Sequence, residues 1–398
     1  MKPAARAAWL GGLVASLLAA GGALPGAIAA EATGRPGVEA LEYGFRFAAA
    51  IKSDPKDRAK AQELVIAEYA RIGAFEEGIR HAEAVEGWRQ GVVYADLGAA
   101  LAGKKRADEA RAQVAKAEKV RSATIGWEGE RIAAHIAQAL AVLGDVDRAR
   151  DVATALAAGD PGQYAGRAAA TLAAGQAAGG NFAQAMQELA ALEGNNDLDS
   201  SWWRSAGYLT LARREELLPE QRLRGVDAAR KSADSIGGLR RIEALGSVAE
   251  EYLRLKRRSR AREALEAADA LLSEMAPGSP ERAALLPDLA RTWGRAGDGR
   301  RARRLLTEAE ALADGALVID RPVIYAAIAS SYQAIDAEPE ARRLFDRSLT
   351  TAAALQNARP RALAVAAICR QMGRNRMPLD DSTRGRLDAL LAGLDDPW

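Results

Sequence analysis

The chain has 398 residues, of which 49% are hydrophobic and 5% aromatic, which excludes a disordered chain and favours close-packed helices over sheet. The formal net charge of +2 comes from Lys2 and Arg6, because residues 1–30 contain no acidic side chain. The rest of the chain is electrically balanced, so its global charge selects neither nucleic acid nor a membrane as a partner.

Residues 1–30 have the composition of a secretory signal peptide. Lys2 and Arg6 precede an apolar stretch over residues 7–20, and small residues follow up to Ala30. We expect cleavage after Ala29 or Ala30 and a periplasmic or secreted protein. A membrane anchor is the alternative, but glycines interrupt the stretch, which is shorter than the roughly 20 continuous apolar residues of a membrane span. We therefore expect no transmembrane segment in the mature chain.

From residue 31 onwards the sequence repeats itself with a period of about 38 residues. We take Gly73 as the first turn of the repeat, and the same frame recurs at Lys105, Gly144, Gly180, Lys256, Gly297 and Asp336. Five residues after the turns stand the small residues Gly78, Ala110, Ala149, Ala185, Ala261, Ala302 and Ala341. Four residues before most turns stands a bulky residue, namely Tyr69, Leu101, Leu140, Tyr252, Trp293 or Tyr332. Gln176 breaks this pattern. A small residue at a helix crossing with bulky neighbours predicts a helical hairpin in each repeat.

The sequence therefore predicts an all-α fold, an α-solenoid of about nine stacked antiparallel helical hairpins over residues 31–398. A degenerate unit is expected near residues 199–237, with helices over 203–216, ending at Pro219, and over 222–235. A last unit turns near Gly373 and closes with a helix over 381–394, whose Asp388 suits a polar cap at an open end. Residues 31–200 carry 20 basic and 25 acidic side chains and residues 201–398 carry 33 and 28, so the halves are mildly acidic and mildly basic.

This spacing resembles that of the tetratricopeptide repeat. Tyr332, Asp336, Ala341 and Phe345 keep most of its pattern, although the period differs from the family's roughly 34 residues and the proline that ends each unit is absent. The resemblance implies a scaffold whose first helices line a concave groove for peptides or protein segments. It places groove positions thirteen, ten, six and three residues before each turn, with small residues such as Ala134, Ala170 and Ala326 forming the floor. The candidate partner-binding residues at these positions are Arg131, Gln138, Arg167, Glu243, Glu250, Arg291 and Gln333.

Arginines recur near the first turn of the leading helices, among them Arg282, Arg321 and Arg361. Two interpretations remain open, namely local pairing with acids such as Glu130, Glu281 and Asp320, or a ladder for the carboxylates of a partner. The basic runs at residues 254–262 and 300–304 favour solvated faces over nucleic acid, with anionic lipid headgroups or an envelope protein as alternatives.

Trp202 and Trp203 adjoin a polar loop in the degenerate unit. We expect one ring to face the core, and Trp202 is a further candidate because an exposed tryptophan can anchor a partner.

The sequence offers little for catalysis. Cys369 is the only cysteine, and His81 and His135, the only histidines, fall in different repeats, so no metal site, cofactor or catalytic residue is predicted. We expect no enzyme but an exported scaffold that binds a protein or peptide partner in its groove. The alternatives are a periplasmic carrier for a peptide, glycan or lipid-like ligand, and a helical-toroid enzyme acting on envelope polymers through Glu243 or Glu250.

Overall fold

The computed structural model describes residues 35, 37–159, 163–176, 181–192 and 198–394. The predicted signal peptide lies outside these residues. The described residues contain nineteen helices and no strand, which confirms the all-α prediction. None of these helices is both long and apolar enough to span a bilayer.

The chain divides into two compact units, residues 1–90 with 303–398 (unit 1) and residues 91–302 (unit 2). The first helices in chain order are α1 (Val38–Ala49), α2 (Pro55–Ile72), α3 (Phe75–Ala82), α4 (Trp88–Gly103), α5 (Ala107–Ser122), α6 (Trp127–Leu143), α7 (Val146–Gly159), α8 (Gln163–Gln176), α9 (Phe182–Ala191) and α10 (Leu198–Ala212). They are followed by α11 (Pro219–Ala233), α12 (Gly238–Arg254), α13 (Arg258–Ser273), α14 (Pro280–Arg295), α15 (Gly299–Gly315), α16 (Arg321–Gln333), α17 (Glu338–Ala353), α18 (Ala358–Arg374) and α19 (Asp381–Ala392).

Helices α2 to α19 pair in chain order as the expected nine hairpins within the described residues, each with an even-numbered leading helix and an odd-numbered following helix. Every described turn of the predicted frame contains a residue with positive φ, from 87° at Gly297 to 58° at Lys256 and Asp336. The next residue donates its N–H to the carbonyl of the bulky residue four positions before the turn, as from Ala74 to Tyr69 at 2.9 Å. This bond closes a helix C-terminus through a left-handed residue.

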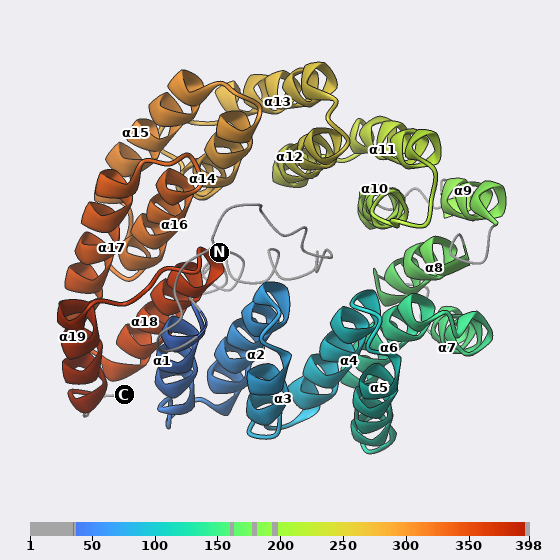
Figure 1. Ribbon diagram of the computed structural model, residues 1–398, viewed down its shortest axis with the longest axis horizontal. Coiled ribbons are helices and arrows are strands. Elements are labelled where there is room, and N and C mark those ends of the chain that lie inside the picture. The colour runs from blue at the N-terminus through green and yellow to red at the C-terminus, as the bar shows by residue number, and fades with distance from the viewer. Residues whose placement is uncertain (1–34, 36, 160–162, 177–180, 193–197, 395–398) are drawn as a thin grey trace, which may run out of the picture. The chain divides into compact units, whose positions relative to one another are not determined.

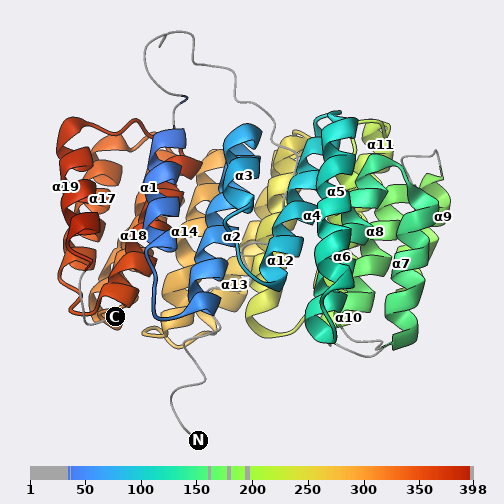
Figure 2. The same ribbon diagram turned by 90° about the horizontal axis from the view of Figure 1, so that it is seen from below.

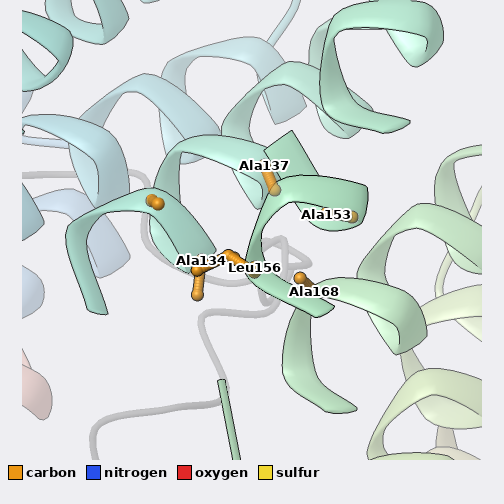
Figure 3. Packing of buried hydrophobic residues seen from close by; sticks show 6 residues of the cluster. Ala134, Ala137, Ala153, Leu156 and Ala168 are labelled. Atoms are coloured by element: carbon orange, nitrogen blue, oxygen red, sulfur yellow. The ribbon is translucent and has the colours of Figure 1, made fainter. Parts of the chain in front are cut away.

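The small residues after the turns are buried, as predicted. Ala110, Ala149, Ala261 and Ala341 have no exposed surface, and the bulky Tyr69 and Leu101 are also fully buried. Figure 3 shows the same principle among α6, α7 and α8, where alanines and one leucine form a core cluster. Because these side chains are short, neighbouring helix backbones can approach closely. The cluster consists of Ala133, Ala134, Ala137, Ala153, Leu156 and Ala168.

In unit 1 helix α1 packs against α18, so helices near opposite ends of the described residues meet. Helix α1 lies between α2 and α18, so the blue and red ends of the colour scale are side by side in Figures 1 and 2. The backbones are close, because a Cβ added at Gly44 would lie 3.2 Å from the Cβ of Cys369. Tyr43 donates its hydroxyl hydrogen bond to Asp388 at 2.9 Å. The expectation of an open end capped by Asp388 is therefore wrong. Helix α1 packs on α18, and Asp388 accepts a hydrogen bond from Tyr43 of α1.

Two boundaries also differ from the sequence prediction. Pro219 is the first residue of α11 and does not end α10, which stops at Ala212. Proline is favoured at this position because the first helical N–H needs no partner within the helix. In the last hairpin the left-handed residue is Arg376, three residues after the predicted turn at Gly373.

Candidate partner-binding site

Unit 2 consists of two layers of helices. Leading helices contact one another, α6 with α8, α8 with α10 and α12 with α14. In Figure 1, α8, α10 and α12 lie on the inner side of the arc that this unit forms, and α9, α11 and α13 lie on its outer side. The candidates that resemblance placed on leading helices therefore belong, in unit 2, to one layer.

A chain of polar side chains connects three successive leading helices of this layer. His135 on α6 bonds through Nδ1 to an Asp96 carboxylate oxygen on α4 at 2.5 Å. Its Nε2 lies 2.6 Å from Nη1 of Arg167 on α8. Arg167 also donates from Nη2 to Oε1 of Gln138 at 2.9 Å. Since Arg131 acts electrostatically on both Asp96 and His135, we call these five residues the α4–α8 cluster.

His135 is neutral in this cluster at neutral pH. Burial lowers the pKa of the imidazole below its ordinary value, and the positive charge of Arg167 lowers it further, although Asp96 opposes both effects. Burial alone would raise the pKa of Asp96, but the interaction with His135, which donates a hydrogen bond to it, and the positive charge of Arg167 lower it overall. A neutral ring that donates from Nδ1 to Asp96 accepts at Nε2 from Arg167. The cluster thus contains one carboxylate and two guanidinium groups.

Of the predicted residues, the structure brings Arg131, Gln138 and Arg167 together. Arg131 and Gln138 are half-buried, whereas Arg167 is 8% exposed. The sequence interpretation missed Asp96 and assigned His135 no role in a site. A signal existed, because Asp96 and His135 each stand nine residues before a turn, at Lys105 and Gly144.

A second group of charges lies on α12 and α14. Arg291 pairs with Asp288 at 2.7 Å, and Glu250 lies 3.9 Å from Arg291 and 3.7 Å from Arg295. Burial, and then the charge of Asp288, raises the pKa of the half-buried Glu243. Positive and negative groups are closely matched here, so this group has no surplus that would select a charged partner.

The two remaining candidates, Trp202 and Gln333, lie on other helices, α10 and α16. Trp202 and Trp203 are both half-buried on α10, and the Trp203 ring centroid is 5.8 Å from the guanidinium carbon of Arg167. Gln333 is half-buried at the end of α16 in unit 1. The ring that contacts the α4–α8 cluster is therefore Trp203, the neighbour of the predicted Trp202.

The small residues expected on the groove floor are buried. Ala134 and Ala326 have no exposed surface, and Ala170 is 3% exposed. Ala134 packs in the core cluster with Ala168 of the next leading helix. The positions ten residues before these turns therefore serve helix packing and do not line a groove.

The recurrent arginines of the leading helices cap preceding helices. Arg282 donates to the carbonyl of Leu272, and Arg321 donates to that of Ala316 at 2.9 Å. These carbonyls lie at the C-terminal ends of α13 and α15, where a cation also favours the helix dipole. Local pairing is thus the better of the two interpretations for Arg282 and Arg321, and backbone carbonyls are among their local partners.

Two shallow grooves lie on α5, α6 and α7, each with a volume of about 380 Å³. They share Glu118, and Arg111, Arg148 and Leu156 contribute to their walls. None of the predicted binding residues lines either groove. Within the described ranges, no three His, Cys, Asp or Glu side chains are placed to hold a metal ion.

No protein-family model and no curated protein matches the chain. Among solved structures it is similar to the Rap protein complexed with competence and sporulation factor, with 11% identity, a TM-score of 0.32, and coverage of 79% of this chain and 96% of that one. It is also similar to Ton1535 from Thermococcus onnurineus NA1, with 14% identity, a TM-score of 0.30, and coverage of 83% and 94%. The described helices themselves identify the chain as an all-α protein of stacked helical hairpins.

Proposed function

We propose that this chain is an exported scaffold of the tetratricopeptide-like kind, without enzymatic activity, that binds an acidic segment of a protein partner on the leading-helix layer of unit 2. The single observation that carries the proposal is the α4–α8 cluster. It connects three successive repeats and places two guanidinium groups in one layer, with Arg131 partly accessible to solvent. A carboxylate of the partner would bond to the accessible guanidinium group.

The geometry also supports recognition without large rearrangement. Arg167 is fixed by His135 and Gln138, and Trp203 lies beside its guanidinium group. Fixed side chains lose little conformational entropy when a partner binds. The rigid hairpins of the repeat would present this surface as a preformed site.

Affinity capture from the protein's own cell envelope, followed by quantitative mass spectrometry, tests the proposal. The bait would be the mature chain, compared with Arg131→Glu and with the control Lys119→Glu, which makes the same charge change at an exposed site on the following helix α5. We expect one near-stoichiometric protein with wild type and control, and at least about tenfold less of it with Arg131→Glu, because reversal replaces attraction by repulsion.

Two other functions make different predictions. A carrier for a peptide, glycan or lipid-like ligand would release a small molecule in native mass spectrometry of the purified chain, with no stoichiometric protein. An enzyme using the raised pKa of Glu243 would lose turnover of an envelope polymer in a folded Glu243→Gln variant. The group of charges around Glu243 gives no reason to prefer the carrier or the enzyme to the scaffold.

A further inference from the structure

The α12–α13 and α14–α15 turns of unit 2 form a neighbouring pair rich in cations. Lys256, Arg257 and Arg258 occupy the first turn, and Arg300 follows the second. The two turns adjoin, because Arg262 of α13 donates from Nη2 to the carbonyl of Ala296 at 3.1 Å. The four cations therefore lie along one edge of the layered repeats, which we call the basic edge.

Other arginines nearby are used to join repeats. Arg260 pairs with Asp227 of α11 at 2.6 Å, and the same carboxylate accepts from Tyr252 at 2.7 Å. In the next repeat, Arg301 pairs with Asp269 of α13. These pairs account for part of the two basic runs as connections between successive hairpins.

The four residues of the basic edge differ from these arginines. Lys256, Arg257, Arg258 and Arg300 are exposed, and among the described residues none of their side chains has a recorded hydrogen bond or ion pair. The nearby Glu251 is 1% exposed and pairs with Arg213. The edge therefore presents four exposed cationic side chains to solvent.

Two kinds of polyanion could bind the basic edge, nucleic acid and a surface of phospholipid headgroups, and they need different features of the protein surface. No residue of the basic edge lines either of the grooves described above, which lie on α5 to α7. The aromatic residues beside the turns, Tyr252 and Trp293, are 4% and 2% exposed, so no ring is available for stacking on an unpaired base. A surface of phosphate headgroups needs neither groove nor stacking, because clustered Lys and Arg attract it electrostatically.

We propose that the basic edge docks this protein on bilayers that contain anionic phospholipid. The interaction is peripheral and electrostatic, and it is separate from the α4–α8 cluster. It weakens as the salt concentration rises, because mobile ions screen charges at an exposed surface.

Vesicle cosedimentation of the mature chain tests the proposal. Vesicles of phosphatidylcholine with and without phosphatidylglycerol are compared at low and physiological salt. We expect binding only with phosphatidylglycerol, reduced by salt, and at least about 30-fold lower partitioning for Arg257→Glu with Arg258→Glu, since each cation at the surface contributes about fivefold. The double control Lys119→Glu with Lys231→Glu, exposed on α5 and α11, should bind like wild type.

The variant should remain folded, because glutamate is favourable near the N-terminus of α13, where Arg258 is the first residue. Circular dichroism checks this. Equal partitioning of wild type and the basic-edge variant, or no binding to phosphatidylglycerol vesicles at low salt, would overturn the proposal. So would tighter binding of a single-stranded oligonucleotide than of the vesicles, with the same loss in the variant, since that would make nucleic acid the partner of the edge.

Discussion

Replacing His135 with Asn should remove an acid-induced loss of stability that the wild-type chain shows between pH 6.5 and 5.5. In the folded protein, burial and Arg167 lower the pKa of His135, while an unfolded histidine titrates near its ordinary value of about 6.5. Below that value the unfolded chain binds a proton that the folded chain does not. Stability is therefore complete above about pH 6.5 and falls as the pH decreases towards the lowered folded pKa.

The size of this effect follows from the number of protons involved. One extra proton in the unfolded state lowers the free energy of unfolding by up to about 1.4 kcal/mol per pH unit. Asp96 adds nothing in this window, because its lowered pKa keeps it ionised there. The Asn side chain has an N–H donor for Asp96, but it is shorter than His and its amide oxygen does not occupy the position of Nε2, which accepts from Arg167. At pH 7.5 the variant should therefore be less stable by about 1–2 kcal/mol.

Urea unfolding of both proteins at pH 7.5, 6.5 and 5.5, followed by circular dichroism, measures the difference. The other histidine, His81, is present in both proteins, so its contribution cancels. We expect the stability gap to narrow by about 1 kcal/mol between pH 6.5 and 5.5. A gap that stays constant with pH would refute the neutral, buried state of His135.

Three further predictions concern the turns, the contact between the chain ends and the α4–α8 cluster. Gly73→Ala should lower the free energy of unfolding by about 1–2 kcal/mol, because Gly73 has a φ of 83°. An added Cβ would meet nothing within 4 Å at Gly73 or at Gly103, so the loss reports the backbone conformation. The control Gly103→Ala, within a helix, should cause no loss in the same urea assay. The fully buried thiol of Cys369 should react with a thiol reagent at least about tenfold faster in Gly44→Trp than in wild type, because the indole ring forces α1 away from α18. An unchanged rate would contradict the packing of α1 on α18. Arg167→Ala should lower the free energy of unfolding by about 2–4 kcal/mol by leaving buried partners unsatisfied, and a loss below about 0.5 kcal/mol would show that the cluster is not formed.

The repeating frame made most of the fold predictable. A left-handed turn, a small residue five positions later and a bulky residue four positions earlier are local requirements of one hairpin, so each copy shows them in sequence. Lys105, Lys256 and Asp336 were placed in turns by this register despite lacking glycine, and all three have positive φ. The register therefore carried more information than residue type alone.

The contact between α1 and α18 could not be predicted in the same way. A repeat pattern describes how each hairpin meets its neighbour, and it is the same whether the two ends of the chain stay apart or meet. The bond from Tyr43 to Asp388 joins residues separated by 345 positions, and neither residue belongs to the repeat signature. Only the three-dimensional arrangement of unit 1 brings them together.

The candidate site was predictable in part for a related reason. Offsets from the turns selected Arg131, Gln138 and Arg167, but they also selected Ala134, which is buried in the core. Offsets fix the face of a helix, and the approach of the next helix decides how much of that face stays accessible. The pairing of His135 with Asp96 required that approach to be known.

The central claim is that the α4–α8 cluster binds an acidic segment of a protein partner. Its most direct test is the ratio of partner to bait captured by Arg131→Glu and by Lys119→Glu, measured side by side with the folded state of both verified by circular dichroism. We expect an unchanged ratio for Lys119→Glu and a ratio at least about tenfold lower for Arg131→Glu. Equal capture by the two variants would contradict it.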